Sequence, residues 1–142
     1  MSETKEVEVM QSVYDKNDEI AKQTNARLTE KEIFAVNVMG SPGAGKTSSL
    51  VKIMEKLGDI TPYVIEGDIE ADTKALQALG IKTIQINTNG ACHLDSPLIG
   101  EAADALDVQN GVLFIENIGN LVCPAEFEIG EHVKMLISTV TE

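Results

Sequence analysis

One stretch constrains this chain more than any other: Gly40-Ser41-Pro42-Gly43-Ala44-Gly45-Lys46-Thr47. It matches the pattern G-x-x-x-x-G-K-[ST], whose backbone N–H groups and lysine surround phosphate groups. The apolar run over 33–39 predicts a buried strand before it. Apolar residues at helical spacing over 48–57, closed by Gly58, predict a helix after it. The motif therefore lies where a phosphate-binding P-loop requires it.

Each residue type in the motif has a physical reason to be there. Gly43 and Gly45 allow the backbone to wrap closely around an anion. Lys46 places a cation near the β- and γ-phosphates, and the Thr47 hydroxyl is a ligand for Mg²⁺. The alternative is a glycine-rich turn that binds no ligand. The predicted nucleotide-binding residues are Gly40, Ser41, Pro42, Gly43, Ala44, Gly45, Lys46, Thr47 and Ser48.

Composition narrows the class of partner. The 142 residues suit a single domain over 1–142, and a hydrophobic content of 43% is enough for a buried core. A formal net charge of −12 argues against nucleic acid and against an anionic membrane surface as partners. No transmembrane run or signal peptide is evident, so we expect a cytoplasmic protein.

The N-terminal region predicts a helix. Apolar residues over 7–28 recur at helical spacing, interrupted by the polar run 15–19. We interpret this segment as an amphipathic helix packed on the outside of the domain or on a partner. Residues 1–6 are polar, and we expect them to be frayed.

The rest of the chain alternates strand and helix patterns. Alternation of this kind predicts an α/β P-loop NTPase fold, with a mostly parallel sheet and helices on both faces. The chain stops directly after the last predicted strand, so we expect a fragment or a naturally shortened domain. Strands are predicted over 33–39, 61–68, 81–87, 111–115 and 132–140, and the later helices over 71–79 and 97–106.

Two carboxylates follow predicted strands and are placed to serve a nucleotide. Asp68 follows the second strand and Glu116 the fourth, where parallel strands bring their ends to one edge. Acidic residues at such positions hold Mg²⁺ directly or through water. Gly119, three residues after Glu116, is a candidate sensor of the γ-phosphate. The alternative for either carboxylate is a solvated acid at a strand end.

A second constellation combines Cys92-His93 with Cys123. Thiolate and imidazole groups suit Zn²⁺ or another late first-row ion such as Ni²⁺. Buried inert thiols and a disulfide are the alternatives, and the spacing alone decides little. Asp95 is either a neighbour of a helix N-cap or an acceptor that supports His93. His132 is interpreted as a surface histidine at the start of a strand.

At this point the sequence resembles a known family, the hydrogenase-maturation nickel-insertion GTPases (the HypB family). The resemblance covers about residues 8–142 and is most specific where C-H-L-D and E-N-x-G-N-L-x-C-P occur in one P-loop chain. The neighbouring urease nickel-insertion GTPases carry a Cys-Pro-His metal loop, which is not matched here. The segments that carry the resemblance are 67–68, 87–95, 114–124 and 138–142.

The resemblance implies a GTPase that binds GTP and GDP and delivers nickel to the large subunit of [NiFe]-hydrogenase. No arginine finger is evident in the sequence near the switch loops, so we expect slow intrinsic hydrolysis. It implies a nickel or zinc site at Cys92, His93 and Cys123, and a GTP-dependent homodimer in which two subunits share metal ligands. Other hydrogenase-maturation proteins are implied partners. The implied catalytic residues are Lys46, Asp68, Glu116 and Gly119, and the implied magnesium ligands are Thr47, Asp68 and Glu116.

The sequence departs from the family in two places. The guanine-reading Asn-Lys-x-Asp motif does not occur, so we expect this chain to lack the C-terminal guanine-specificity segment. The cysteine-rich N-terminus of some members is also missing, and there is no histidine-rich tract. Two other functions stay open: an ATP-using P-loop enzyme of the small-molecule kinase type, and a non-catalytic metal-binding regulatory module.

Overall fold

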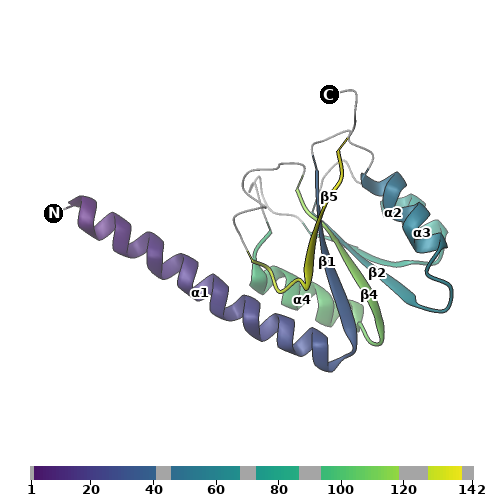
Figure 1. Cartoon of the computed structure of the whole chain (residues 1–142), viewed down its shortest axis with the longest axis horizontal. Coiled ribbons are helices and arrows are strands. Elements are labelled where there is room, and N and C mark those ends of the chain that lie inside the picture. Colours follow the sequence, from purple (N-terminus) through teal and green to yellow (C-terminus); the bar gives the residue numbers. More distant parts are fainter. Residues whose placement is uncertain (1, 41–45, 68–72, 87–93, 119–127, 139–142) are drawn as a thin grey trace.

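The structure is a computed structural model of the chain and describes residues 2–40, 46–67, 73–86, 94–118 and 128–138. Within the first helix, side chains are described from residue 16 onward. Helices and strands alternate along the described residues (Figure 1). Their order is α1 (Ser2–Glu30), β1 (Ile33–Met39), α2 (Lys46–Glu55), β2 (Thr61–Glu66), α3 (Thr73–Ala78), β3 (Lys82–Gln85), α4 (Ser96–Leu106), β4 (Gly111–Glu116) and β5 (Val133–Leu136).

The strands of the described residues form one parallel sheet in the order β3-β2-β4-β1-β5. Strand β4 lies between β1 and β2, and its register places Glu116 beside Val38 of β1 and Glu66 of β2. Helices α1 and α4 lie on one face of the sheet, and α2 and α3 lie on the other (Figure 1). The predicted fold, a parallel sheet with helices on both faces and a preceding helix, is confirmed.

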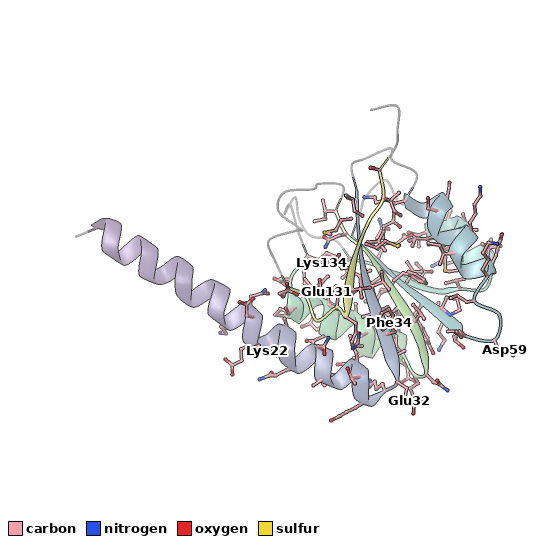
Figure 2. The ribbon with its side chains drawn as sticks, viewed as in Figure 1. Lys22, Glu32, Phe34, Asp59, Glu131 and Lys134 are labelled. Atoms are coloured by element: carbon pink, nitrogen blue, oxygen red, sulfur yellow. The ribbon has the colours of Figure 1, made fainter. Side chains whose placement is uncertain are left out.

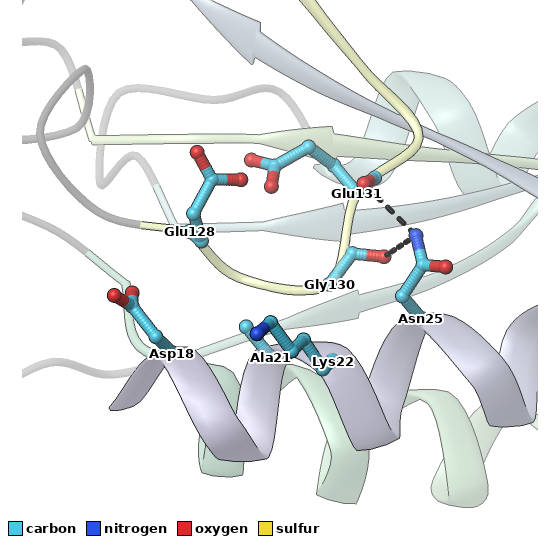
Figure 3. Close-up of a pocket in the computed structure, with 7 residues that line it drawn as sticks. All are labelled: Asp18, Ala21, Lys22, Asn25, Glu128, Gly130 and Glu131. Carbon is cyan, nitrogen blue, oxygen red and sulfur yellow. Dashed lines mark hydrogen bonds between the residues drawn. The ribbon is translucent and has the colours of Figure 1, made fainter. Parts of the chain in front are cut away.

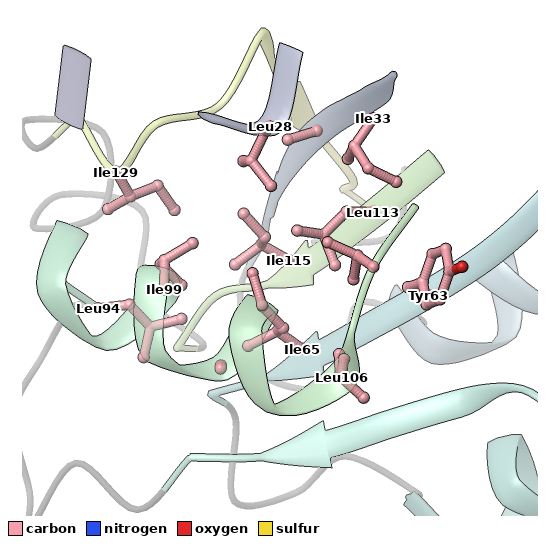
Figure 4. Packing of buried hydrophobic residues seen from close by; sticks show 14 residues of the cluster. Leu28, Ile33, Tyr63, Ile65, Leu94, Ile99, Leu106, Leu113, Ile115 and Ile129 are labelled. Atoms are coloured by element: carbon pink, nitrogen blue, oxygen red, sulfur yellow. The ribbon is translucent and has the colours of Figure 1, made fainter. Parts of the chain in front are cut away.

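Side chains alternate between two cores because successive residues of a strand point to opposite faces. Ala35 and Ile115 belong to the larger core under α1 and α4 (Figure 4). Val36 and Phe114, one residue away on each strand, belong to the core under α2 and α3. The same alternation determines on which face of the sheet each polar side chain at a strand end lies.

Helix α1 is longer than predicted, because it begins at Ser2 and includes residues 2–6, which the sequence analysis left outside the helix. Polarity alone does not stop a helix, since Glu and Lys are good helix formers. The C-terminal half packs on the domain, with Ala21, Thr24 and Leu28 buried. The first half of the ribbon projects beyond the sheet (Figure 1).

Strands β3 and β5 are shorter than the patterns over 81–87 and 132–140 that predicted them. Each ends where its ladder partner ends: β3 pairs with Tyr63–Glu66 of β2, and β5 pairs with Val36–Met39 of β1. Gly67, which follows β2, is required by a close approach. A Cβ atom there would lie 2.8 Å from side-chain atoms of Leu94. The loop after β2 and the start of α4 are thus pressed together.

Candidate nucleotide site

The lysine of the P-loop motif opens helix α2 and is buried, with 4% of its surface exposed. Its ammonium group donates to the carbonyl oxygens of Gly40 at 3.2 Å and Asn117 at 3.4 Å. These carbonyls follow β1 and β4, which are neighbours in the sheet. The cation therefore lies at the carboxyl edge of the sheet, where ligands of parallel α/β proteins bind. The motif residues 41–45 lie outside the described residues.

The threonine of the motif contacts Glu116, one of the two predicted carboxylates. The Thr47 hydroxyl donates to the Glu116 carboxylate, at 3.0 Å from Oε1 and 3.3 Å from Oε2. Glu116 is 1% exposed and ends β4, beside the strand that leads into the P-loop. Hard oxygen donors of this kind are the ligands that Mg²⁺ prefers. The pair fits a magnesium ion, for which it would supply a hydroxyl and a carboxylate.

A second buried carboxylate was not predicted. Glu66 ends β2 in register with Glu116, is fully buried, and accepts a hydrogen bond from the Thr73 hydroxyl of α3. The sequence pointed to Asp68, two residues later, which lies outside the described residues. The sequence held one signal for the burial of Glu66. Side chains alternate between the two faces of a strand, so Glu66 lies on the same face as the buried Val64.

The predicted soft-metal ligands Cys92, His93 and Cys123 lie outside the described residues, as does Gly119. Within the described ranges, no group of three or more His, Cys, Asp or Glu side chains is arranged to hold a metal ion. Asp95 is described: its carboxylate accepts from the Leu98 amide at 3.2 Å and caps α4. Asp95 is therefore the N-cap itself and not a neighbour of the cap, and His93, the other predicted partner, lies outside the described residues.

His132 lies directly before β5, and its ring makes contacts that the sequence did not predict. It is partly buried, and its Nδ1 accepts from the Ala35 amide at 2.9 Å. Its Nε2 lies 2.8 Å from the Thr29 hydroxyl, and its ring stacks on Phe34 with centroids 5.4 Å apart. Burial lowers the pKa of His132. The ring joins α1 to the sheet, since its partners lie on α1 and β1.

A pocket of about 410 Å³ lies beside α1 rather than at the P-loop (Figure 3). In it the carboxyl groups of Glu128 and Glu131 face each other, and Lys134 pairs with Glu128 at 2.9 Å. Burial and the hydrogen bond with Glu128 raise the pKa of Glu131 to about 7. The same hydrogen bond, followed by that of Lys134, lowers the pKa of Glu128. The lining residues are Asp18, Ala21, Lys22, Asn25, Glu128, Gly130 and Glu131.

The raised pKa of Glu131 predicts a pH dependence of stability. The ordinary pKa of a glutamate is 4.5, so the stabilisation of the fold by Glu131 is fully present below pH 4.5. This stabilisation is lost as the pH rises to about 7. We expect the free energy of unfolding, measured relative to Glu131→Gln, to fall by about 1–3 kcal/mol across this range. Urea titrations of both proteins between these values measure it. Comparison with the variant cancels the opposite contribution of His132. A difference that is independent of pH would contradict the prediction.

The comparisons with known proteins agree with this geometry. A family model for the CobW/HypB/UreG nucleotide-binding domain matches residues 34–140. The hydrogenase maturation factor HypB of Escherichia coli K12 is 43% identical over 146 residues, covering 100% of this chain and 50% of that protein. This chain spans about half the length of the curated relatives it matches.

Two crystal structures share the fold. HypB from Archaeoglobus fulgidus matches with a TM-score of 0.81 at 32% identity, covering 89% of this chain and 64% of that one. HypB from Helicobacter pylori in complex with nickel matches with a TM-score of 0.78 at 34% identity, covering 85% of this chain and 59% of that one.

A parallel sheet with a buried lysine at the carboxyl end of β1 and a threonine–carboxylate pair beside it defines a P-loop NTPase domain. Within that class, this chain belongs to the CobW/HypB/UreG family of nucleotide-binding domains. The resemblance predicted from the sequence motifs is confirmed. In the part of the chain that the structure describes, no helix is long and apolar enough to cross a membrane.

Proposed function

We propose that this chain is the GTP-binding and GTP-hydrolysing domain of a metallochaperone that delivers nickel during [NiFe]-hydrogenase maturation. One observation carries the proposal: Lys46 and the Thr47–Glu116 pair meet at the carboxyl edge of the sheet in a chain of the CobW/HypB/UreG family. The relatives named above are hydrogenase maturation factors, and one was crystallised with nickel.

The nucleotide chemistry follows from the buried groups. A triphosphate bound over the P-loop would draw the Lys46 ammonium toward its β- and γ-phosphates. Thr47 and Glu116 would hold the Mg²⁺ that neutralises developing charge, with Asp68 beside them. We keep Gly119 as the proposed sensor of the γ-phosphate. After hydrolysis the γ-phosphate no longer contacts the segment from Gly119 to Cys123, and we propose this loss of contact as the signal to the metal site.

The metal chemistry rests on the ligands predicted from the sequence. Cys92, His93 and Cys123 suit Ni²⁺ or Zn²⁺ and supply three ligands per chain. Three ligands leave a four-coordinate ion incomplete, which favours sharing across a two-fold axis of a homodimer. The proposed partners are the hydrogenase large subunit and other hydrogenase-maturation proteins. The cytoplasmic location stays a prediction.

Calorimetry on this chain and on a longer gene product tests the nucleotide assignment. We expect Mg²⁺-GTP to bind more tightly than Mg²⁺-ATP, with the difference larger in the longer protein, because this sequence lacks the guanine-reading motif. Preference for ATP in both proteins would favour the kinase alternative. Binding without hydrolysis in the longer protein would favour a regulatory module.

Titration with Ni²⁺ during sedimentation tests the metal site. We expect a dimer with the GTP analogue and weaker Ni²⁺ binding in Cys92→Ala. Binding should also weaken as the pH falls, because thiolates must be deprotonated. A protein that stays monomeric, with an affinity independent of Cys92, would contradict the metal proposal while leaving the nucleotide proposal intact.

A further inference from the structure

An asparagine in the middle of the sheet requires an explanation. Asn37 lies in β1 among apolar residues and is 0% exposed. A buried amide is costly unless its groups are hydrogen-bonded. Its Nδ2 donates to Glu131 Oε2 at 2.7 Å, and its Oδ1 accepts from Asn117 Nδ2 at 2.9 Å. Asn37 therefore joins two segments that lie 94 and 80 residues away along the chain.

Asn117 is the residue at which this chain of hydrogen bonds meets the nucleotide site. It is 1% exposed, and its main-chain carbonyl accepts from the Lys46 ammonium at 3.4 Å. Its side-chain Oδ1 accepts from the amides of Leu94 at 3.4 Å and Ile118 at 2.9 Å. Leu94 directly follows the predicted metal ligand His93. One buried residue thus contacts the P-loop lysine and the main chain that leads from the metal-ligand segment.

The other end of the chain of hydrogen bonds is anchored at α1. Glu131 is 8% exposed and lies on the side of the sheet that faces α1 (Figure 2). Its Oε1 accepts from the Ile129 amide at 3.3 Å, and its main-chain carbonyl accepts from Asn25 of α1 at 3.1 Å. The side chain that orients Asn37 is therefore fixed to a part of the fold distant from the phosphate loop.

We propose that Asn117 is a positioning residue that couples Lys46 to the main chain at Leu94, and that Asn37 and Glu131 hold its side chain in place. When phosphate oxygens draw the Lys46 ammonium away, the Asn117 carbonyl loses a charged donor. The same residue holds the Leu94 amide, so the start of α4 responds. The inference rests on the proposed function, and Asn117, two residues before Gly119, serves both paths to the metal ligands: the start of α4 and the loop from Gly119 to Cys123.

A polarity swap tests the role of Asn37. The test is made above pH 7, the approximate pKa of Glu131, so that its side chain is ionised. In Asn37→Asp the side chain still accepts from Asn117 but has no proton for the Glu131 carboxylate, so two carboxylates face each other. Adding Glu131→Gln restores the contacts of position 131 with residues 37 and 129: its Nε2 donates to the new carboxylate at position 37, and its Oε1 accepts from the Ile129 amide. The double variant keeps the shape of the network and reverses one bond.

The main measurement is the ratio of the Kd for Ni²⁺ in the GTP-analogue and GDP states. In the unchanged protein we expect a ratio typical of allosteric coupling, roughly 5- to 150-fold. Asn37→Asp should bring it to within about twofold of one, and the double variant should restore most of it. Asn117→Asp loses the donation to Asn37 and adds a buried negative charge. It should act like Asn37→Asp and serves if that variant does not fold.

Tyr63→Phe is the matched control, because it removes a buried hydrogen bond to Gln109 (3.0 Å) elsewhere in the same core. It should lower the melting temperature and leave the ratio unchanged. Amide hydrogen exchange gives a readout without nickel: adding the GTP analogue should change the protection of Leu94 in the unchanged protein and not in Asn37→Asp.

The outcomes separate the two proposals. If the unchanged protein binds neither GTP nor Ni²⁺, the proposed function fails and the coupling falls with it. If the unchanged protein couples the two ligands and folded Asn37→Asp keeps the ratio and the exchange response, the positioning role alone is overturned. An equal loss of coupling in Tyr63→Phe would also overturn it, because the effect would then follow stability.

Discussion

Replacing Lys46 with alanine should weaken the binding of Mg²⁺-GTP by at least about thirtyfold and abolish hydrolysis, since truncating one partner of a buried hydrogen-bonded charge pair costs about 2–5 kcal/mol. The ammonium group is buried and held by the Gly40 and Asn117 carbonyls before any ligand arrives. When a triphosphate binds, its oxygens would draw this ammonium group from the two carbonyls, and the variant loses that charge. Lys46 is the one cationic side chain within residues 40–48.

Calorimetry with a GTP analogue and a phosphate-release assay measure both effects. Lys52→Ala is the matched control, because Lys52 lies on the same helix but is exposed. It should bind and hydrolyse nucleotide as the unchanged protein does. Normal hydrolysis by a purified, folded Lys46→Ala protein would remove the P-loop assignment.

Much of this site could be predicted because its signals are local. The strand before the P-loop is an apolar run that is interrupted once and leads directly into the motif, and the strand before Glu116 is a continuous apolar run that ends in that carboxylate. Parallel strands align their carboxyl ends, so Thr47 and Glu116 were expected to be neighbours before any contact was known. The cap of α4 was likewise predictable, since Asp95 directly precedes Ser96 and the helix-starting Pro97.

The buried polar residues next to the site were not predictable, because the residues that they contact lie far away along the chain. Nothing local marks Asn37, which interrupts an apolar strand and is explained only by Glu131 and Asn117. The contacts of His132 were missed for the same reason: its partners on α1 and β1 are about a hundred residues away along the chain. Periodicity identifies the face of a strand, whereas these contacts depend on which strands become neighbours.

The second large effect is expected at Glu116. Changing it to glutamine should lower the affinity for Mg²⁺ in the nucleotide complex, and the rate of hydrolysis, by roughly 10- to 100-fold. The glutamine keeps an oxygen that accepts from the Thr47 hydroxyl, which now lies 3.0 Å from Glu116 Oε1. What it removes is the negative charge, the property that makes a carboxylate a strong ligand for a hard divalent cation.

The same variant should be as stable as the unchanged protein or more stable, and this separates a functional role from a structural one. A carboxylate that is 1% exposed is costly to bury, and the amide lowers that cost without changing the shape. Thermal unfolding without nucleotide, together with hydrolysis measured across a Mg²⁺ titration, provides both quantities. Glu55→Gln, on the exposed surface of α2, is the control for the change of charge. Loss of stability with an unchanged Mg²⁺ dependence would show that Glu116 supports the fold and does not serve the nucleotide.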